Sequence, residues 1–478
     1  MSVTAAILLA GLARPPAERE TDTVSDLGGG QVAYPPSVLE ERPPTRGGWA
    51  ESKDRLRTAT TTEPGRLWLI GAVVAPLVVA FGVMTSWQVA DRAASADDVV
   101  RHSQPLSADA ASIYRSLADA DTAAAGGFLA GAQEPAEVHA RYEKDIATAS
   151  RLLVKAAANT DVSSDSGRQI ARLNEQLPRY TGLIERARAN NRQGLPLGGA
   201  YLRYANEQMT DELLPAAEKL YQAETARLGR DRSDARTWPF LALAVGVPAL
   251  AVLVWAQLRD YRRTNRVFNR GLLAATAAAV VVLLWLVVGH AVARAELDSA
   301  HEHGQKSLKV LNEARISSLK ARANENLTLV ARGAVLTADG KDKYETDYAA
   351  GMKVLGERLE AAGKLADDGA GRGPVTEAVA KVKEWRERHG KARDTDDSGD
   401  YNGALKLVIG DKKSTGQSFD GVDAALERAL AHEQREFTRA AEDGRGALTG
   451  LPAGAPALAL LGAAAAGVGI SRRLAEYR

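Results

Sequence analysis

The hydrophobic residues of the chain gather in four segments, at 67–90, 237–258, 271–293 and 446–470. Three of them contain no ionisable residue, and the third along the chain contains only His290, near its end. An α-helix rises about 1.5 Å per residue and needs about 20 apolar residues to cross the hydrocarbon core of a bilayer. The pattern therefore predicts four transmembrane helices.

The fourth segment is the weakest, because it is rich in Ala and Gly and contains Pro452 and Pro456. A soluble Ala-rich helix is the alternative. Membrane-spanning helices tolerate Gly and Pro better than soluble helices do. Arg472 and Arg473 follow closely, which favours a span that ends there.

Basic residues gather on three flanks that four spans place on one side of the membrane, namely 1–65, 259–270 and 471–478. They are Lys53, Arg55, Arg57, Arg66, Arg259, Arg262, Arg263, Arg266, Arg270, Arg472, Arg473 and Arg478. The positive-inside rule assigns that side to the cytoplasm. We therefore expect a multi-pass plasma-membrane protein with cytoplasmic N- and C-termini, and with residues 91–236 and 294–445 outside.

The two outer segments are nearly equal in length and echo each other in sequence. Residues Arg141–Asp145 (RYEKD) open a helix in the first, and Lys343–Asp347 (KYETD) open one in the second. This self-similarity predicts a tandem duplication of a span–domain–span unit. Neither segment shows the alternating pattern of a strand, whereas apolar residues spaced three or four apart indicate helices.

Helix-breaking residues divide each outer domain into four helices. The breaks fall at 126–135, 160–167 and 193–199 in the first domain, and at 333–340, 367–374 and 393–402 in the second. The expected fold is all-α: four transmembrane helices with two extracytoplasmic antiparallel four-helix bundles. The first and last helices of each bundle are expected to continue into spans. In the first bundle, kinks are expected at Pro178 in helix three and at Pro215 in helix four.

Composition narrows the function further. The 61 Lys and Arg residues balance 60 Asp and Glu residues, and this net charge of +1 argues against nucleic-acid binding. The chain has no Cys, which excludes disulfides and Cys-ligated metal sites. Residues 1–65, rich in Pro and Gly, are expected to be disordered.

The sequence carries no recognisable motif for catalysis or cofactor binding, so we expect a non-enzymatic protein without cofactor or metal. His301 and His303 are two residues apart and diverge on a helix. His432-Glu433 lacks the second His of a zinc-protease motif. The alternating glycines at 369–373 are interpreted as a flexible turn before Pro374.

Two polar clusters are candidates for contact with partners. The turn at the outer tip of the first bundle carries Arg188, Asn190, Asn191, Arg192, Gln193 and Pro196, and could dock a protein; an ordinary solvated turn is the alternative. The cytoplasmic link carries Arg259, Arg262, Arg263, Arg266 and Arg270, and could contact an acidic cytosolic partner or anionic lipid; lipid anchoring alone is the alternative.

Three segments carry a resemblance to a known family. They are Asp119–Gly131 (DADTAAAGGFLAG), Arg141–Ile146 (RYEKDI) and Arg188–Gly198 (RANNRQGLPLG). With the four-span layout, they resemble the GlnX type of actinobacterial membrane protein, encoded beside a glutamine/glutamate-binding lipoprotein and the soluble Ser/Thr kinase PknG. The resemblance implies that a loaded solute-binding lipoprotein docks outside and that the signal reaches a Ser/Thr protein kinase inside.

The leading hypothesis is thus a transmembrane sensor or adaptor in the lipid bilayer. A chemoreceptor-like protein that binds a small ligand directly and a structural scaffold of the envelope are the alternatives. A transporter subunit is disfavoured because the spans have few polar positions. The ligand, the recognising bundle and the formation of a homodimer stay open.

Overall fold

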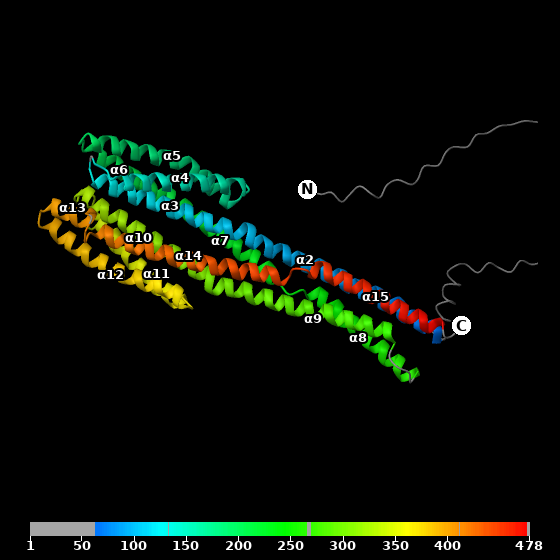
Figure 1. Ribbon diagram of the computed structural model, residues 1–478. Coiled ribbons are helices and arrows are strands. Elements are labelled where there is room, and N and C mark those ends of the chain that lie inside the picture. Colours follow the sequence, from blue (N-terminus) through cyan, green and yellow to red (C-terminus); the bar gives the residue numbers. More distant parts are fainter. Residues whose placement is uncertain (1–62, 132, 265–268, 411, 476–478) are drawn as a thin grey trace, which may run out of the picture. The chain divides into compact units, whose positions relative to one another are not determined.

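The described residues of the computed structural model are 63–131, 133–264, 269–410 and 412–475. Within these ranges the chain is helical almost throughout and contains no strand, which confirms the all-α prediction (Figure 1). Four helices are long and apolar enough to cross a membrane. Residues 1–65 were predicted to be disordered, and residues 1–62 of this segment lie outside the described residues.

The first half of the chain forms a bundle and two candidate spans. Its helices are α2 (Glu63–Asp98), η1 (Val99–Ser103), α3 (Gln104–Leu129), α4 (Ala136–Ala158), α5 (Asp165–Arg192), α6 (Leu197–Gln208), η2 (Met209–Leu213), α7 (Leu214–Arg236) and α8 (Phe240–Thr264). The α2–η1–α3 and α6–η2–α7 runs are continuous, and the breaks between helices fall at or next to the turns expected from the sequence.

The second half repeats this order with one change, a break in the place of η2. Its helices are α9 (Arg270–Ser299), η3 (Ala300–Gln305), α10 (Lys306–Ala331), α11 (Lys343–Leu365), α12 (Gly369–Asp397), α13 (Tyr401–Ile409), α14 (Thr415–Ala447) and α15 (Leu451–Ala475). An unpredicted break separates α13 from α14, so the fourth helix is split. Ser414 caps the new start by accepting a hydrogen bond from the Gln417 amide.

The glycines at 369–373 do not form the predicted flexible turn. They lie in the first turns of α12, whose start is capped by the Asp368 carboxylate, 2.7 Å from the Gly371 amide nitrogen. Pro374 is inside the helix near this end, where few backbone amides have a helical partner. A good N-cap thus outweighs the low helix propensity of the glycines.

Short π-helical segments interrupt three of the long helices. Two precede a proline: η1 ends just before Pro105 in the first turn of α3, and η2 just before Pro215 in the first turn of α7. Proline lacks an amide hydrogen and clashes with the preceding turn, so the helix widens rather than ends. The third segment, η3, has no proline.

The last helix of each half does not run on into a span as expected. Thr237 adopts an extended conformation after α7, and α8 starts beyond Pro239. Between α14 and α15, Gly450 has a φ of 87°, a left-handed conformation that glycine adopts without steric cost. Only the first helix of each half is therefore continuous with its span, through η1 or η3.

The two bundles share one hydrophobic core. Helices α3 and α10 pack against each other, and small alanine side chains on both allow their backbones to approach closely. The Thr122 hydroxyl donates a hydrogen bond across this contact to the carbonyl oxygen of Leu319, at 2.9 Å. The remaining helices flank this central pair (Figure 1).

Helix α15 packs between α2 and α9, and α8 contacts the same two helices. Small residues make these contacts close. A Cβ atom added to Gly82 would lie 2.2 Å from the Ala459 Cβ, and one added to Gly271 would lie 2.2 Å from the Ala465 carbonyl oxygen. Close approach through Gly and Ala stabilises helix pairs in membranes. The Ala and Gly residues that made the fourth segment the weakest candidate span are therefore the residues that allow this close packing.

Candidate functional site

The predicted docking cluster at the tip divides into buried and exposed residues. Arg188 is 9% exposed, stacks 4.1 Å from the Tyr142 ring centre and pairs with Glu134 at 3.1 Å. The Asn191 amide donates a hydrogen bond to the Phe128 carbonyl oxygen at 2.9 Å. These two residues tie the turns of the tip together.

The rest of the cluster is more accessible. Arg192, Gln193 and Pro196 are exposed, and half-buried Asn190 donates to the Arg186 carbonyl oxygen. Exposed Leu195 and Leu197 stand among them. The surface left for a partner is thus small, combines polar and apolar side chains, and includes Arg192.

A buried carboxylate lies in the core of the first bundle. Asp121 of α3 accepts hydrogen bonds from the Tyr180 hydroxyl at 3.2 Å and from the Asn206 amide at 2.8 Å. It has no ion pair with a cation among the described residues. Burial raises the pKa of Asp121 to about 6, although both hydrogen bonds lower it.

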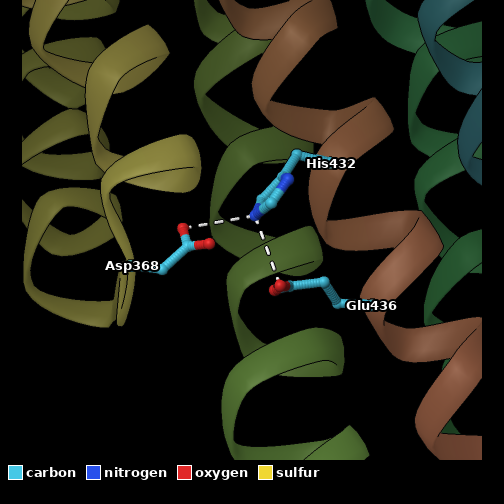
Figure 2. A group of neighbouring side chains, drawn as sticks. All are labelled: Asp368, His432 and Glu436. Atoms are coloured by element: carbon cyan, nitrogen blue, oxygen red, sulfur yellow. Dashed lines mark ion pairs between the residues drawn. The ribbon is translucent and has the colours of Figure 1, made fainter.

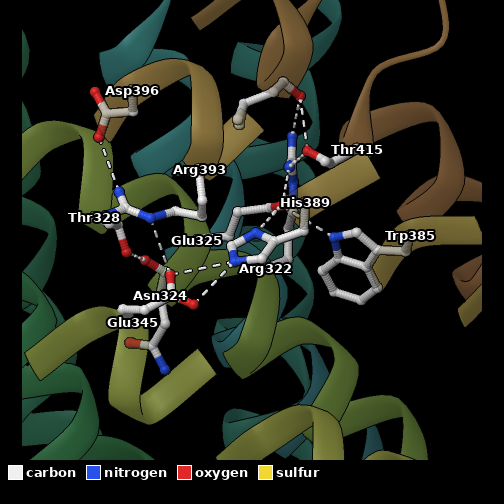
Figure 3. A network of polar contacts seen from close by, with 11 residues as sticks. Arg322, Asn324, Glu325, Thr328, Glu345, Trp385, His389, Arg393, Asp396 and Thr415 are labelled. Carbon is white, nitrogen blue, oxygen red and sulfur yellow. Dashed lines mark hydrogen bonds and ion pairs between the residues drawn. The ribbon is translucent and has the colours of Figure 1, made fainter. Parts of the chain in front are cut away.

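The second bundle also has a buried carboxylate, but with cations around it (Figure 3). Glu325 of α10 is fully buried and accepts a hydrogen bond from Trp385 at 3.1 Å. It pairs with Arg322 at 2.5 Å and with His389 at 2.8 Å. Arg322 also donates to Thr415 and to the Val408 carbonyl oxygen, beside the break between α13 and α14.

His389 links this pair to a third acidic group. Its Nε2 atom lies 3.1 Å from the Glu345 carboxylate, and its ring stacks on Tyr348 with 3.7 Å between centroids. Burial by itself lowers the pKa of His389, but the hydrogen bonds to Glu325 and Glu345 raise it to about 9. The network is thus held together by a protonated imidazole at neutral pH.

The two networks follow a similar plan, in which an acidic residue of the first helix of the bundle contacts an aromatic residue of the third. Asp121 precedes its aromatic partner Tyr180 by 59 residues, and Glu325 precedes Trp385 by 60. Sequence reasoning missed both. In the first domain the available signal was an acidic residue, Asp121, within a stretch of small residues. Glu325 stands among Arg322, Asn324 and Asn326, so no such signal marked it.

A surface group could in principle hold a metal ion (Figure 2). The His432 Nε2 atom lies 3.3 Å from an Asp368 oxygen and 3.4 Å from a Glu436 oxygen. Asp368 already caps α12, and Glu436 is one turn from His432 on α14. Ion pairing and capping account for all three side chains, so we assign no metal to them. His432 therefore pairs with Asp368 and Glu436, and not with Glu433, its neighbour in sequence.

The predicted Arg-rich link is partly described. Arg259 lies 5.3 Å from the Trp255 ring centre, and Arg262 and Arg270 are exposed. Arg266 is outside the described residues, and nothing is described of the Arg263 side chain. Next to Arg259, Asp260 pairs with Arg473 of α15 at 2.5 Å, which ties the link to the last helix.

A comparison with models of known families finds a match in the first bundle. Residues 95–233 match the family model of the actinobacterial sensor domain, from the end of α2 almost to the end of α7. No curated protein and no solved structure matches the chain. The sensor-domain match and the four apolar helices together support a multi-pass transmembrane sensor of actinobacterial type.

Proposed function

We propose that this protein is a non-enzymatic transmembrane sensor or adaptor. Its bundles lie outside the cytoplasm and report the availability of glutamate or glutamine, carried by a solute-binding lipoprotein, to a cytoplasmic Ser/Thr kinase. The observation that carries the relay is the continuity of α2–η1–α3 and of α9–η3–α10 from span to bundle. A displacement at the bundle reaches the membrane through these two helices.

The route of the signal follows from which helices are continuous. Because α7 and α14 are interrupted before their spans, they transmit displacement less directly than α3 and α10 do. Helices α3 and α10 contact each other along the shared core, so a shift of one moves the other. The displacement then reaches the cytoplasmic side, where Arg259, Arg262 and Arg270 are placed to contact an acidic partner or anionic lipid.

The lipoprotein would dock at the tip of the first bundle. The exposed part of the cluster, Arg192, Gln193 and Pro196, supports this placement because it combines a cation, an amide and an apolar ring on one turn. The resemblance to the GlnX type is what suggests a lipoprotein and a kinase as the two partners.

The test uses the full-length protein in lipid nanodiscs and the amino-acid-binding lipoprotein of the same organism. We expect the loaded lipoprotein to bind more tightly than the unloaded one. Arg192→Glu should weaken that binding at least about tenfold, by the loss of charged hydrogen bonds at the contact. Arg168→Glu, an exposed Arg at the other end of α5, is the matched control and should bind normally.

Equal binding of loaded and unloaded lipoprotein, or none, would contradict the adaptor. A structural scaffold would then be the stronger account. If kinase signalling in cells stayed dependent on glutamate after removal of both bundles, the relay would be wrong even where the lipoprotein binds.

A further inference from the structure

A cavity lies where the bundle approaches the spans. Its volume is about 470 Å³, within the range of roughly 300–1,000 Å³ typical of small-molecule sites. Helices α3, α7, α10 and α14 all contribute to its wall. Gln104 and Gln305 on its rim lie next to η1 and within η3, so the cavity adjoins both π-helical segments.

One wall of the cavity carries a guanidinium group without an ion pair. Arg115 donates to the Asn312 side-chain oxygen and, at 2.8 Å, to the Ser112 hydroxyl. Both partners are neutral, and no carboxylate among the described residues pairs with it. Burial and the neighbouring Arg315 lower the pKa of Arg115 to about 10. Arg115 is half-buried, and a cation partly withdrawn from water with only neutral partners is costly unless an anion compensates it.

The second cation of the cavity is already neutralised. Arg315 makes two hydrogen bonds to Asp423, at 2.7 and 3.0 Å. It also lies 3.8 Å from Glu427, an exposed residue on the cavity rim. Arg115 is therefore the guanidinium group of this cavity that has no ion pair with a carboxylate among the described residues.

The remaining wall is largely apolar. Leu228, Leu308, Leu430 and Phe437 line it, and three of these four side chains are less than 10% exposed. A ligand here meets a cation at one end and hydrocarbon at the other.

We propose that this cavity binds an organic monocarboxylate with a short aliphatic body. The carboxylate accepts hydrogen bonds from the free donors of Arg115, and the body packs on Leu308, Leu430 and Phe437. Planar guanidinium groups match carboxylates in geometry as well as charge. The site goes beyond the proposed adaptor function and does not depend on it. A ligand held by these four helices would bias their positions next to the spans. Only this signalling consequence rests on the proposed function.

The test is calorimetric titration of the full-length protein in nanodiscs with acetate, butanoate, hexanoate and the neutral amide hexanamide. We expect saturable binding of hexanoate with a Kd below about 1 mM. Affinity should rise by about fourfold per methylene along the series, because each added methylene is buried. Hexanamide should bind at least about tenfold more weakly than hexanoate.

Arg115→Met should weaken hexanoate binding at least about tenfold while leaving the unfolding midpoint unchanged or raised, since it removes a buried unpaired charge. Ala111→Leu keeps Arg115 but fills the cavity from a buried wall position, and should abolish binding. Arg172→Met, in the same bundle but away from the cavity, is the matched control.

Failure of hexanoate to saturate, equal binding of hexanamide, or an unaffected Arg115→Met variant would overturn the site. The titration contains neither lipoprotein nor kinase, so these outcomes leave the adaptor proposal standing. Conversely, failure of the loaded lipoprotein to bind, which would contradict the adaptor, would leave the carboxylate site standing.

Discussion

Arg445 of α14 donates a hydrogen bond to Asp97 of α2, with 2.8 Å between the Nη1 and Oδ1 atoms, although the two residues are 348 apart in sequence. The other half mirrors this contact: Arg236 at the end of α7 pairs with Asp298 of α9 at 2.7 Å. Each Asp lies two residues before a π-helical segment. The last bundle helix of each half is therefore tied to the first helix of the other half, just where that helix changes its winding.

Loss of these two ion pairs should affect signalling but hardly affect the stability of the fold. Half-exposed ion pairs each contribute about 0–1 kcal/mol, so the double variant Arg236→Gln/Arg445→Gln should unfold at nearly the wild-type midpoint. Its relay of the outer signal should be weakened, because α7 and α14 no longer hold α9 and α2. A double variant with normal signalling in cells would show that these pairs play no part in the relay.

Stability should fall at alkaline pH through His389. Its pKa is about 9 in the folded protein against 6.5 for the free side chain, so its contribution is complete below pH 6.5 and is lost as pH rises through 9. The shift corresponds to at most about 3 kcal/mol. In chemical unfolding at pH 6 and pH 10, His389→Gln should remove this part of the pH dependence.

Half-exposed His139 in the first bundle provides the control, because His139→Gln should keep the alkaline loss of stability. If the wild type and His389→Gln lost equal stability between the two pH values, the charged network in Figure 3 would be assigned wrongly.

Asp121 should act in the opposite pH range. Burial raises its pKa in the folded protein to about 6, above the 3.8 of a free Asp side chain, so the ionised form costs stability above pH 6 and that cost disappears as pH falls toward 4. Asp121→Asn keeps the shape and lacks the charge. Relative to wild type, it should gain stability on passing from pH 4 to pH 7, by up to about 3 kcal/mol. A constant difference between the two proteins across this range would contradict the prediction.

The close contact between α2 and α15 predicts a position-dependent effect of added volume. Gly82→Leu would force its side chain against Ala459 and the Ala455 carbonyl oxygen, and overpacking of this kind costs about 1–3 kcal/mol. Gly467→Leu on α15 meets no atom within 4 Å and should be tolerated. Thermal unfolding in nanodiscs should thus separate the two variants, and equal midpoints would argue against this helix pairing.

The absence of Cys makes the topology directly testable. Val162→Cys and Val379→Cys place single thiols on exposed positions of the first and second bundles, and Arg262→Cys places one on the link. A membrane-impermeant maleimide should label the two bundle thiols in intact cells and the link thiol only after lysis. The reverse pattern would invert the proposed orientation.

Much of the fold could be read from local chemistry. Charge-free segments of sufficient length predicted the candidate spans, and clusters such as Gly126–Gly131 or Gln193–Gly199 predicted turns, because both signals reside in adjacent residues. The break between α13 and α14 was not predicted, because the residue that stabilises it is not a neighbour in sequence. It is stabilised by Arg322, which bonds to Val408 and Thr415 from a distant helix.

The candidate site could be predicted only in part for the same reason. Arg188 and Asn191 stood in the sequence beside Arg192 as equals, yet contacts with Tyr142 and Phe128 bury the first two and leave the third exposed. Arg115 had no feature to distinguish it from other Arg residues. Its unpaired charge exists only because α10 brings a neutral Asn312 to it and Asp423 is taken by Arg315.

What the sequence by itself determined was therefore the helical class, the number of candidate spans and the repeat, since each depends on composition and period over short stretches. The tertiary structure alone decided that the two bundles share a core through α3 and α10, that α15 packs between α2 and α9, and which charges are buried unpaired. Those features depend on side chains hundreds of residues apart meeting at distances of a few ångströms, and no local pattern encodes which ones meet.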